Sequence, residues 1–216
     1  LGIIGAGLGT VLATVFTIGM YLLFYLNPIH RARFKVEQSL RFDPGIMRRY
    51  VRLGFPSGFE LFIGAGTFNL FLLLFQSYGV DEGAAMAIVF NWDMLSFVPM
   101  AGLGIGVMSL IGRFVGAGDL QRANQVIASG LILALGYSGT LAILFLVFRF
   151  ELIEVFATRD ANFADIRELA GMMMFGLVSY MLADAVILIA GGTLRGAGDT
   201  RWVMLVSTGL HLLMLA

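Results

Sequence analysis

The sequence predicts an all-α membrane protein in which several helices cross the bilayer. Of its 216 residues, 59% are hydrophobic and only 13% are charged, and the mean hydropathy is +0.90. A soluble domain of this length carries considerably more charge. The apolar residues also form runs of about 20 residues, the length that crosses the hydrocarbon core as a helix. Such runs must be helical, because lipid offers an unpaired backbone group no water to bind.

Each run of this kind is expected to form one transmembrane helix. The expected helices cover about residues 1–26, 53–77, 84–111, 126–148, 169–193 and 202–216. The first run has no basic leader and no small-residue cleavage site, so we interpret it as a transmembrane helix rather than a signal peptide. Residue 1 is not methionine, and the last run shows no stop signal. We therefore expect the chain to be a piece of a longer protein, cut within helices at both ends.

The longest predicted connection covers residues 28–52. Asn27-Pro28 ends the preceding helix, because proline disfavours helical backbone in the residue before it. The two acids of the connection, Glu37 and Asp43, are outnumbered by its bases. These bases are Arg31, Arg33, Lys35, Arg41, Arg48, Arg49 and Arg52. Two interpretations stay open: an ordinary basic loop, or a linker between two lobes with an amphipathic stretch on anionic headgroups.

Basic residues also predict how the chain is oriented in the membrane. Eleven of the 14 Lys and Arg residues lie in the first, third and fifth connections. Because bases accumulate on the cytoplasmic side, these connections are expected to be cytoplasmic. The third and fifth share a motif, Arg followed shortly by Gly-Ala-Gly-Asp, at 113–119 and 195–199. We expect a glycine to end one helix and the aspartate to cap the next, and the similarity indicates an internal repeat.

Three acidic residues lie within the expected spans: Glu60, Asp93 and Asp184. A carboxylate at membrane depth is costly and is by default a candidate functional residue. Tyr180 precedes Asp184 by four residues and so lies on the same helix face. A carboxylate beside a phenol can hold a proton or a hard cation such as Na⁺. The alternative interpretation is a buried aspartate that is hydrogen-bonded to another helix only for packing.

The other candidate site residues each have a structural explanation as well as a functional one. Glu60 follows Pro56 by one turn, so a proline-induced bend could turn it toward a cavity, but it could also be wetted at the cytoplasmic surface. Asp93 and the nearby Asn91 are cavity candidates in the next span. His211 could join a proton path, although a lone histidine is more often a packing residue.

Other chemistries lack their residues. The sequence has no cysteine, nucleophile elbow, phosphate-binding loop or paired-histidine spacing, so we expect neither an enzyme nor a cofactor. No basic and aromatic surface outside the apolar runs indicates nucleic acid. The expected partners are the lipid bilayer and small organic molecules, because the 12 methionines and 19 phenylalanines suit a permissive apolar cavity.

With these motifs the chain resembles the multidrug and toxic compound extrusion (MATE) family of secondary transporters. The similar motifs are Leu53-Gly54-Phe55-Pro56, Pro99 to Gly106, Gly112-x3-Gly116-x-Gly118-Asp119 with Ala123, and Leu194-Arg195-Gly196-Ala197-Gly198-Asp199-Thr200 with Tyr180 and Asp184 upstream. The resemblance covers nearly the whole chain. It implies the C-terminal lobe of a twelve-helix, two-lobe fold. Residues 1–27 would end the N-terminal lobe, 28–52 would join the lobes, and 53–216 would form the C-terminal lobe.

The resemblance also implies a function. It implies an antiporter in the cell (inner) membrane that exports drug-like, cationic or amphipathic compounds in exchange for Na⁺ or H⁺, with the N-terminal lobe of the same protein as partner. In the NorM-type branch, a Tyr and an Asp four residues apart, upstream of the arginine, form the cation-coupling site. Tyr180, Asp184 and Arg195 have this spacing. The branch has an acid where this chain has Gly64, so either Glu60, one turn earlier, replaces it or the coupling ion is held differently.

Apart from a possible Na⁺ at Asp184, no metal is expected. Two alternatives to the antiporter function remain. A lipid-linked sugar flippase of the same superfamily is disfavoured because no Lys or Arg lies deep in the spans. A membrane scaffold that transports nothing would tolerate apolar replacement of the three membrane acids.

Overall fold

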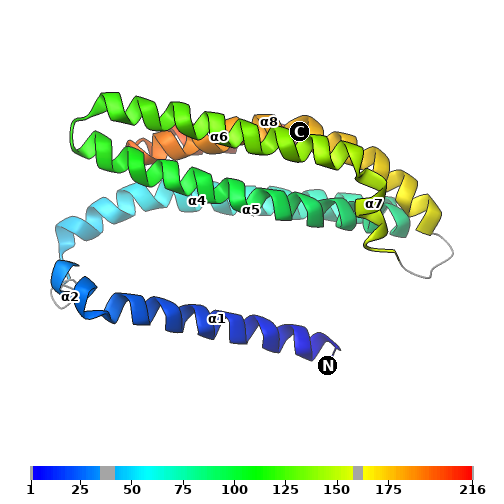
Figure 1. The fold of residues 1–216 in the computed structure, drawn as a ribbon, viewed down its shortest axis with the longest axis horizontal. Helices are drawn as coiled ribbons and strands as arrows, with labels where there is room; N and C mark the ends of the chain where they lie inside the picture. Colours follow the sequence, from blue (N-terminus) through cyan, green and yellow to red (C-terminus); the bar gives the residue numbers. More distant parts are fainter. Residues whose placement is uncertain (1, 35–41, 158–162, 216) are drawn as a thin grey trace. The chain divides into compact units, whose positions relative to one another are not determined.

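The computed structural model describes residues 2–34, 42–157 and 163–215. Within these ranges every regular element is a helix (Figure 1). The helices are α1 (Gly2–Leu26), α2 (Pro28–Phe34), α4 (Pro44–Tyr78), α5 (Val80–Gly116), α6 (Leu120–Val147), α7 (Arg149–Glu154), α8 (Phe163–Gly196) and α9 (Thr200–Leu215). Five of them, α1, α4, α5, α6 and α8, are long and apolar enough to cross a membrane. The predicted all-α, multi-pass fold is confirmed.

Helix boundaries differ from the expected ones most clearly in the basic connection. Helix α2 lies within 28–52, and α4 begins at Pro44 rather than near Leu53. Hydropathy locates only the part of a helix that lipid covers. Backbone hydrogen bonds continue beyond it wherever long basic side chains such as Arg48 and Arg49 can keep their charged ends in water. Residues 35–41, which include three of the charged residues of this connection, lie outside the described ranges.

The chain divides into two compact units, Leu1–Val51 and Arg52–Ala216. In the first unit, α1 ends before Asn27, whose side chain accepts the backbone N–H of Ile29 at 3.0 Å and so caps α2. The rings of Phe24 and His30 stack across this junction with centroids 5.0 Å apart. The predicted helix end at Asn27-Pro28 is therefore confirmed, and a short second helix follows it directly.

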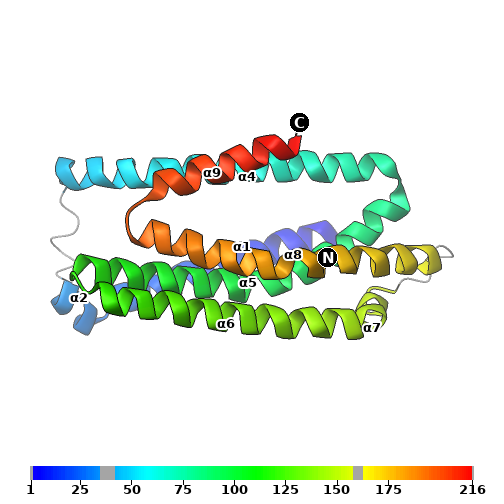
Figure 2. The ribbon, with the colours of Figure 1, turned by 90° about the horizontal axis from the view of Figure 1, so that it is seen from above.

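The second unit is built on α5, α6 and α8, which all contact one another (Figure 2). Glycines let the α5 and α8 backbones approach closely. A Cβ atom on Gly192 would lie 2.7 Å from the carbonyl oxygen of Gly104, and one on Gly196 would lie 2.5 Å from that of Met108. Close backbone approach through small residues is typical of membrane helix pairs. These three helices therefore form the most closely packed part of the unit.

The two Gly-Ala-Gly-Asp turns have the same geometry. One joins α5 to α6 and the other joins α8 to α9. Gly118 and Gly198 have φ values of +75° and +90°, a left-handed conformation that glycine adopts without strain. Asp119 and Asp199 then accept a backbone N–H from the helix that follows, at 3.0 Å and 3.4 Å. The predicted glycine turn and aspartate cap are confirmed at both places.

Helices α4 and α9 are packed more loosely than the other three long helices of this unit. Of the described residues of α4, only Pro56 and Thr67 are buried, whereas nine residues of α8 are. The two loose helices approach each other at Gly64, where an added Cβ atom would lie 3.5 Å from Nε2 of His211. Few contacts therefore hold α4 to the rest of the unit, and one of them is made with the polar side chain of His211.

Candidate functional site

Two acids and a phenol come together where α5 packs against α8. Asp93 belongs to α5, and Tyr180 and Asp184 belong to α8. The Tyr180 hydroxyl lies within hydrogen-bonding reach of the Asp93 carboxylate, and Asp184 interacts electrostatically with both. Both aspartates are half-buried, while 46% of Tyr180 is exposed. We call these three residues the acid cluster. The structure thus joins the predicted Tyr180–Asp184 pair to Asp93, a cavity candidate that the sequence also allowed to assist Asp184.

The acid cluster has the chemistry of a site for a small hard cation or a proton. Its donors are carboxylate and phenol oxygens, which suit Na⁺. Within the described part of the chain neither aspartate forms an ion pair with a basic side chain. A proton or cation bound between the two carboxylates would relieve their mutual repulsion. No group of three or more His, Cys, Asp and Glu residues that could hold a metal is found among the described residues.

Two long-range hydrogen bonds hold the α5 segment that carries Asp93. The indole N–H of Trp92 donates to the carbonyl oxygen of Leu152 at 3.2 Å, and the Tyr137 hydroxyl donates to the carbonyl oxygen of Ser96 at 3.2 Å. Both bonds link α5 to other helices. Sequence reasoning missed them, because nothing in the local pattern around Trp92 or Tyr137 indicates a partner so distant along the chain.

Glu60 lies elsewhere, in an ion pair with Arg195. The Nη2 atom of Arg195 donates to the two carboxylate oxygens of Glu60 at 2.7 Å and 2.9 Å. The side chains of Glu60 and Arg195 are only 13% and 29% exposed. Arg195 follows Asp184 by eleven residues, about 16 Å along a helix. The structure therefore does not bring Glu60 to the expected cation site. A base in the last turn of α8 neutralises it instead.

A pocket of about 520 Å³ lies beside this ion pair, between α4 and α9. Glu60, Arg195, Gly64 and His211 are among its lining residues. The Nδ1 atom of His211 lies 2.7 Å from the carbonyl oxygen of Ser207. A carbonyl can only accept, so Nδ1 carries the proton and Nε2 is turned toward α4. His211 thus belongs with the ion pair, and the structure does not place it in the acid cluster.

Asn91, the remaining cavity candidate, is turned to its own helix. Its side-chain amide donates to the carbonyl oxygen of Ala87 at 2.7 Å. This bond satisfies one donor within α5, and Asn91 is exposed. A role in a cavity therefore stays a prediction.

Helices long and apolar enough to span the membrane, half-buried acids within them and glycine-packed contacts define the class: a multi-pass integral membrane protein. The chain belongs to the MatE family, whose family model matches residues 56–215. The predicted resemblance to the MATE family is therefore confirmed, and so is the multi-pass membrane class.

Named relatives support the same family. The chain is 29% identical over 208 residues to the probable multidrug resistance protein NorM of Pasteurella multocida, covering 95% of this chain and 44% of the relative. It is 31% identical over 202 residues to the probable NorM of Shewanella oneidensis, covering 91% of this chain and 43% of the relative. The chain thus spans less than half the length of these relatives.

Solved structures show the same fold. A MOP superfamily transporter from Pyrococcus furiosus, described as having a binding pocket of reversed polarity, matches 80% of this chain and 38% of its own with a TM-score of 0.68 and 28% identity. A multidrug resistance MATE family transporter in an outward-facing conformation matches 75% of this chain and 36% of its own, with a TM-score of 0.68 and 27% identity. The all-α half of a two-lobe transporter is thus confirmed as the fold.

Proposed function

We propose that this chain is part of a secondary antiporter that exports drug-like, cationic or amphipathic compounds in exchange for Na⁺ or H⁺. The observation that carries the proposal is the acid cluster: two aspartates and a tyrosine that lie together in membrane-spanning helices. The names of the relatives support a multidrug substrate range. In this proposal Asp184 is the central coupling carboxylate, and Tyr180 and Asp93 assist it.

The proposed coupling follows from the placement of the acids on two helices. Asp93 is fixed to α5 and Asp184 to α8, so an ion held by both favours the arrangement in which these helices keep the two carboxylates together. Without the ion, repulsion between the carboxylates favours a different arrangement. An ion can shift an equilibrium between inward-open and outward-open states only through its different affinity for the two. The acid cluster supplies such a difference, because its geometry depends on how α5 and α8 pack.

In this proposal Asp93, and not Glu60, is the second carboxylate that binds the coupling ion. A carboxylate that already accepts two charge-assisted hydrogen bonds from Arg195 offers a weaker site for another cation. We therefore propose that Glu60 acts on the position of α4 rather than on the ion.

The test measures drug efflux from liposomes that contain the full-length protein, under Na⁺ and H⁺ gradients imposed separately. Asp184→Asn keeps the size of the side chain but cannot carry a negative charge, so efflux driven by the coupling ion should disappear. Asp165→Asn, the same change at an exposed position of α8, is the matched control and should leave efflux unchanged. Wild-type efflux by the Asp184→Asn protein under both gradients would disprove the proposed coupling and favour the scaffold alternative.

A further inference from the structure

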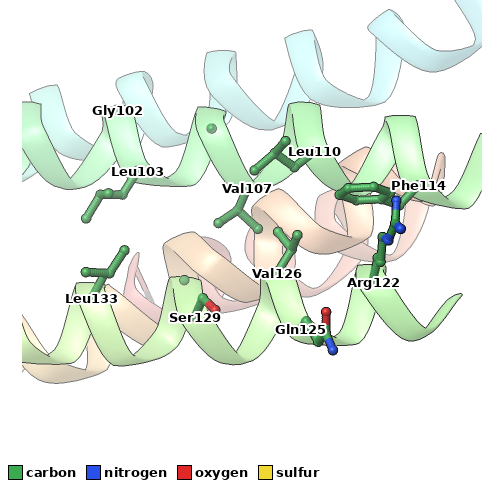
Figure 3. Close-up of a pocket in the computed structure, with 12 residues that line it drawn as sticks. Gly102, Leu103, Val107, Leu110, Phe114, Arg122, Gln125, Val126, Ser129 and Leu133 are labelled. Carbon is green, nitrogen blue, oxygen red and sulfur yellow. The ribbon is translucent and has the colours of Figure 1, made fainter. Parts of the chain in front are cut away.

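A groove between α5 and α6 is separate from the acid cluster and from the ion pair. It has a volume of about 460 Å³, and none of the residues of those two sites lines it. Figure 3 shows apolar side chains that point into the space between the two helices. From α5 these are Leu103, Val107, Leu110 and Phe114, and from α6 they are Val126 and Leu133.

Two glycines of α5 keep the groove open. An added Cβ atom on Gly102 or Gly106 would meet nothing within 4 Å. Gly104, between them, is turned the other way, and its added Cβ atom would lie 3.4 Å from the carbonyl oxygen of Leu188 on α8. The glycine-rich stretch of α5 therefore has two roles. One glycine packs against α8, while its neighbours leave a hollow on the face toward α6.

The polar residues that line the groove come from the first part of α6. Arg122 and Gln125 lie in its first two turns, and Ser129 lies one turn further along (Figure 3). Nε of Arg122 lies 3.3 Å from a carboxylate oxygen of Asp119, but 68% of the arginine side chain is exposed. Its other N–H donors can therefore reach a ligand. This end adjoins the α5–α6 turn, which the basic residues predict to be cytoplasmic.

We propose that this groove binds an anionic phospholipid of the cytoplasmic leaflet, with an acyl chain between α5 and α6 and the phosphate at Arg122 and Gln125. The groove is apolar along most of its length and cationic at one end, and a phospholipid in this leaflet presents its charge and its chains in the same order. Basic pockets between membrane helices on the cytoplasmic side are suited to anionic headgroups. An organic cation fits this end less well than an anion, because it would meet the Arg122 guanidinium.

The repeated turn provides an internal control. Arg201 lies two residues after Asp199, and Arg122 lies three residues after Asp119; both arginines are exposed at the start of a helix. Arg201 does not line the α5–α6 groove. A lipid attracted only by surface charge would respond equally to loss of either arginine, whereas a lipid held in the groove responds to Arg122 alone.

The experiment compares binding of phosphatidylglycerol and phosphatidylcholine with identical chains to the purified full-length protein, by native mass spectrometry and by thermal melting. The wild-type protein should bind phosphatidylglycerol more tightly. Arg122→Gln should reduce this preference about fivefold, the effect of one base near an anionic surface. Gly106→Leu, which fills the groove, should weaken binding of both lipids. Two control changes are Arg201→Gln and Gly66→Leu, the latter at an open position of α4. They should change neither the preference for phosphatidylglycerol nor the binding of either lipid.

A second measurement does not depend on the folding of these variants. A fluorophore attached to Ser129→Cys should be quenched by brominated phosphatidylglycerol in vesicles, and more strongly than by brominated phosphatidylcholine. Equal quenching by the two lipids, or equal effects of Arg122→Gln and Arg201→Gln, would overturn the proposal. If neither lipid quenched the label, the groove would be covered by protein, either the N-terminal lobe or a second copy. This result would also overturn the proposal.

Discussion

Acidic side chains lie in the membrane helices at two sites, and the two sites differ in whether a base neutralises the acid. Glu60 is neutralised within the protein by Arg195, and the two groups make two short hydrogen bonds. In the acid cluster, Asp93 and Asp184 lie near each other and near a phenol, with no base paired to them among the described residues. Helix α8 contributes to both places. The difference indicates that an acid in a membrane helix becomes an ion-site candidate when the structure pairs it with no basic side chain.

The same comparison separates a structural role from a proposed functional one. An ion pair that is largely desolvated is sensitive to loss of either partner, because the other charge is then left buried. The Glu60–Arg195 pair also connects the loosely packed α4 to the tightly packed α8. Two neighbouring carboxylates contribute nothing comparable to packing, and their repulsion is relieved only when a proton or cation arrives. We therefore expect mutations at the two places to affect different measurements.

The largest expected effect is that of Asp93→Asn on ion affinity. Loss of one of two carboxylates should weaken binding of the coupling ion by about 3 kcal/mol, roughly 100-fold, because interactions with a charged partner are the strong ones. Thermal melting of the full-length protein, titrated with Na⁺ at several pH values, measures this affinity. Asp165→Asn serves as the control. An unchanged ion-dependent shift in the Asp93→Asn protein would remove Asp93 from the site.

A smaller effect, on stability rather than ion affinity, is expected for Glu60→Gln. It leaves the Arg195 guanidinium without its counter-charge and should lower the stability by about 2 kcal/mol, less than for a fully buried pair because Arg195 is partly exposed. The double change Glu60→Arg with Arg195→Glu restores opposite charges and should recover part of the loss. The ion-dependent shift in melting temperature should persist in Glu60→Gln. If the ion-dependent shift disappeared in Glu60→Gln, Glu60 would belong to the ion site, and the two sites would not differ in function.

The smallest expected effect is that of Tyr180→Phe. The change removes one hydroxyl from the acid cluster but leaves both carboxylates and the ring, so ion affinity should fall by about 1 kcal/mol, roughly fivefold. Isothermal titration with Na⁺, or with pH if the ion is a proton, measures the change. Tyr78→Phe, the same change at an exposed tyrosine in the last turn of α4, is the matched control. A loss as large as that of Asp93→Asn would mean that the phenol, and not the second carboxylate, is the main partner of Asp184.

The sequence by itself determined the features that depend on neighbouring residues. Lipid-length apolar runs located the five helices that are long and apolar enough to cross a membrane, whereas the sixth run, 202–216, corresponds to the 16-residue α9, which is not one of these five. Repeated Gly-Ala-Gly-Asp motifs located two turns with left-handed glycines and aspartate caps. The four-residue spacing of Tyr180 and Asp184 placed them on one face of α8. Each of these inferences needs only the geometry of one helix or one turn, and the family motifs are equally local. The early start of α4 at Pro44 was missed, because hydropathy does not register helical turns that lie outside lipid.

Only the tertiary structure decided which acid meets which partner. Asp93 joins Tyr180 and Asp184 because close contacts such as Gly104 against Gly192 set how α5 and α8 face each other. Glu60 meets Arg195 because α4 approaches the last turn of α8, and not the turn that carries Asp184. The depth of a residue in the membrane can be estimated from its position in a span, but the rotation of each helix about its axis cannot. That rotation is settled by packing between helices, and it separates an acid that meets a base, such as Glu60, from acids that meet each other and a phenol, such as Asp93 and Asp184.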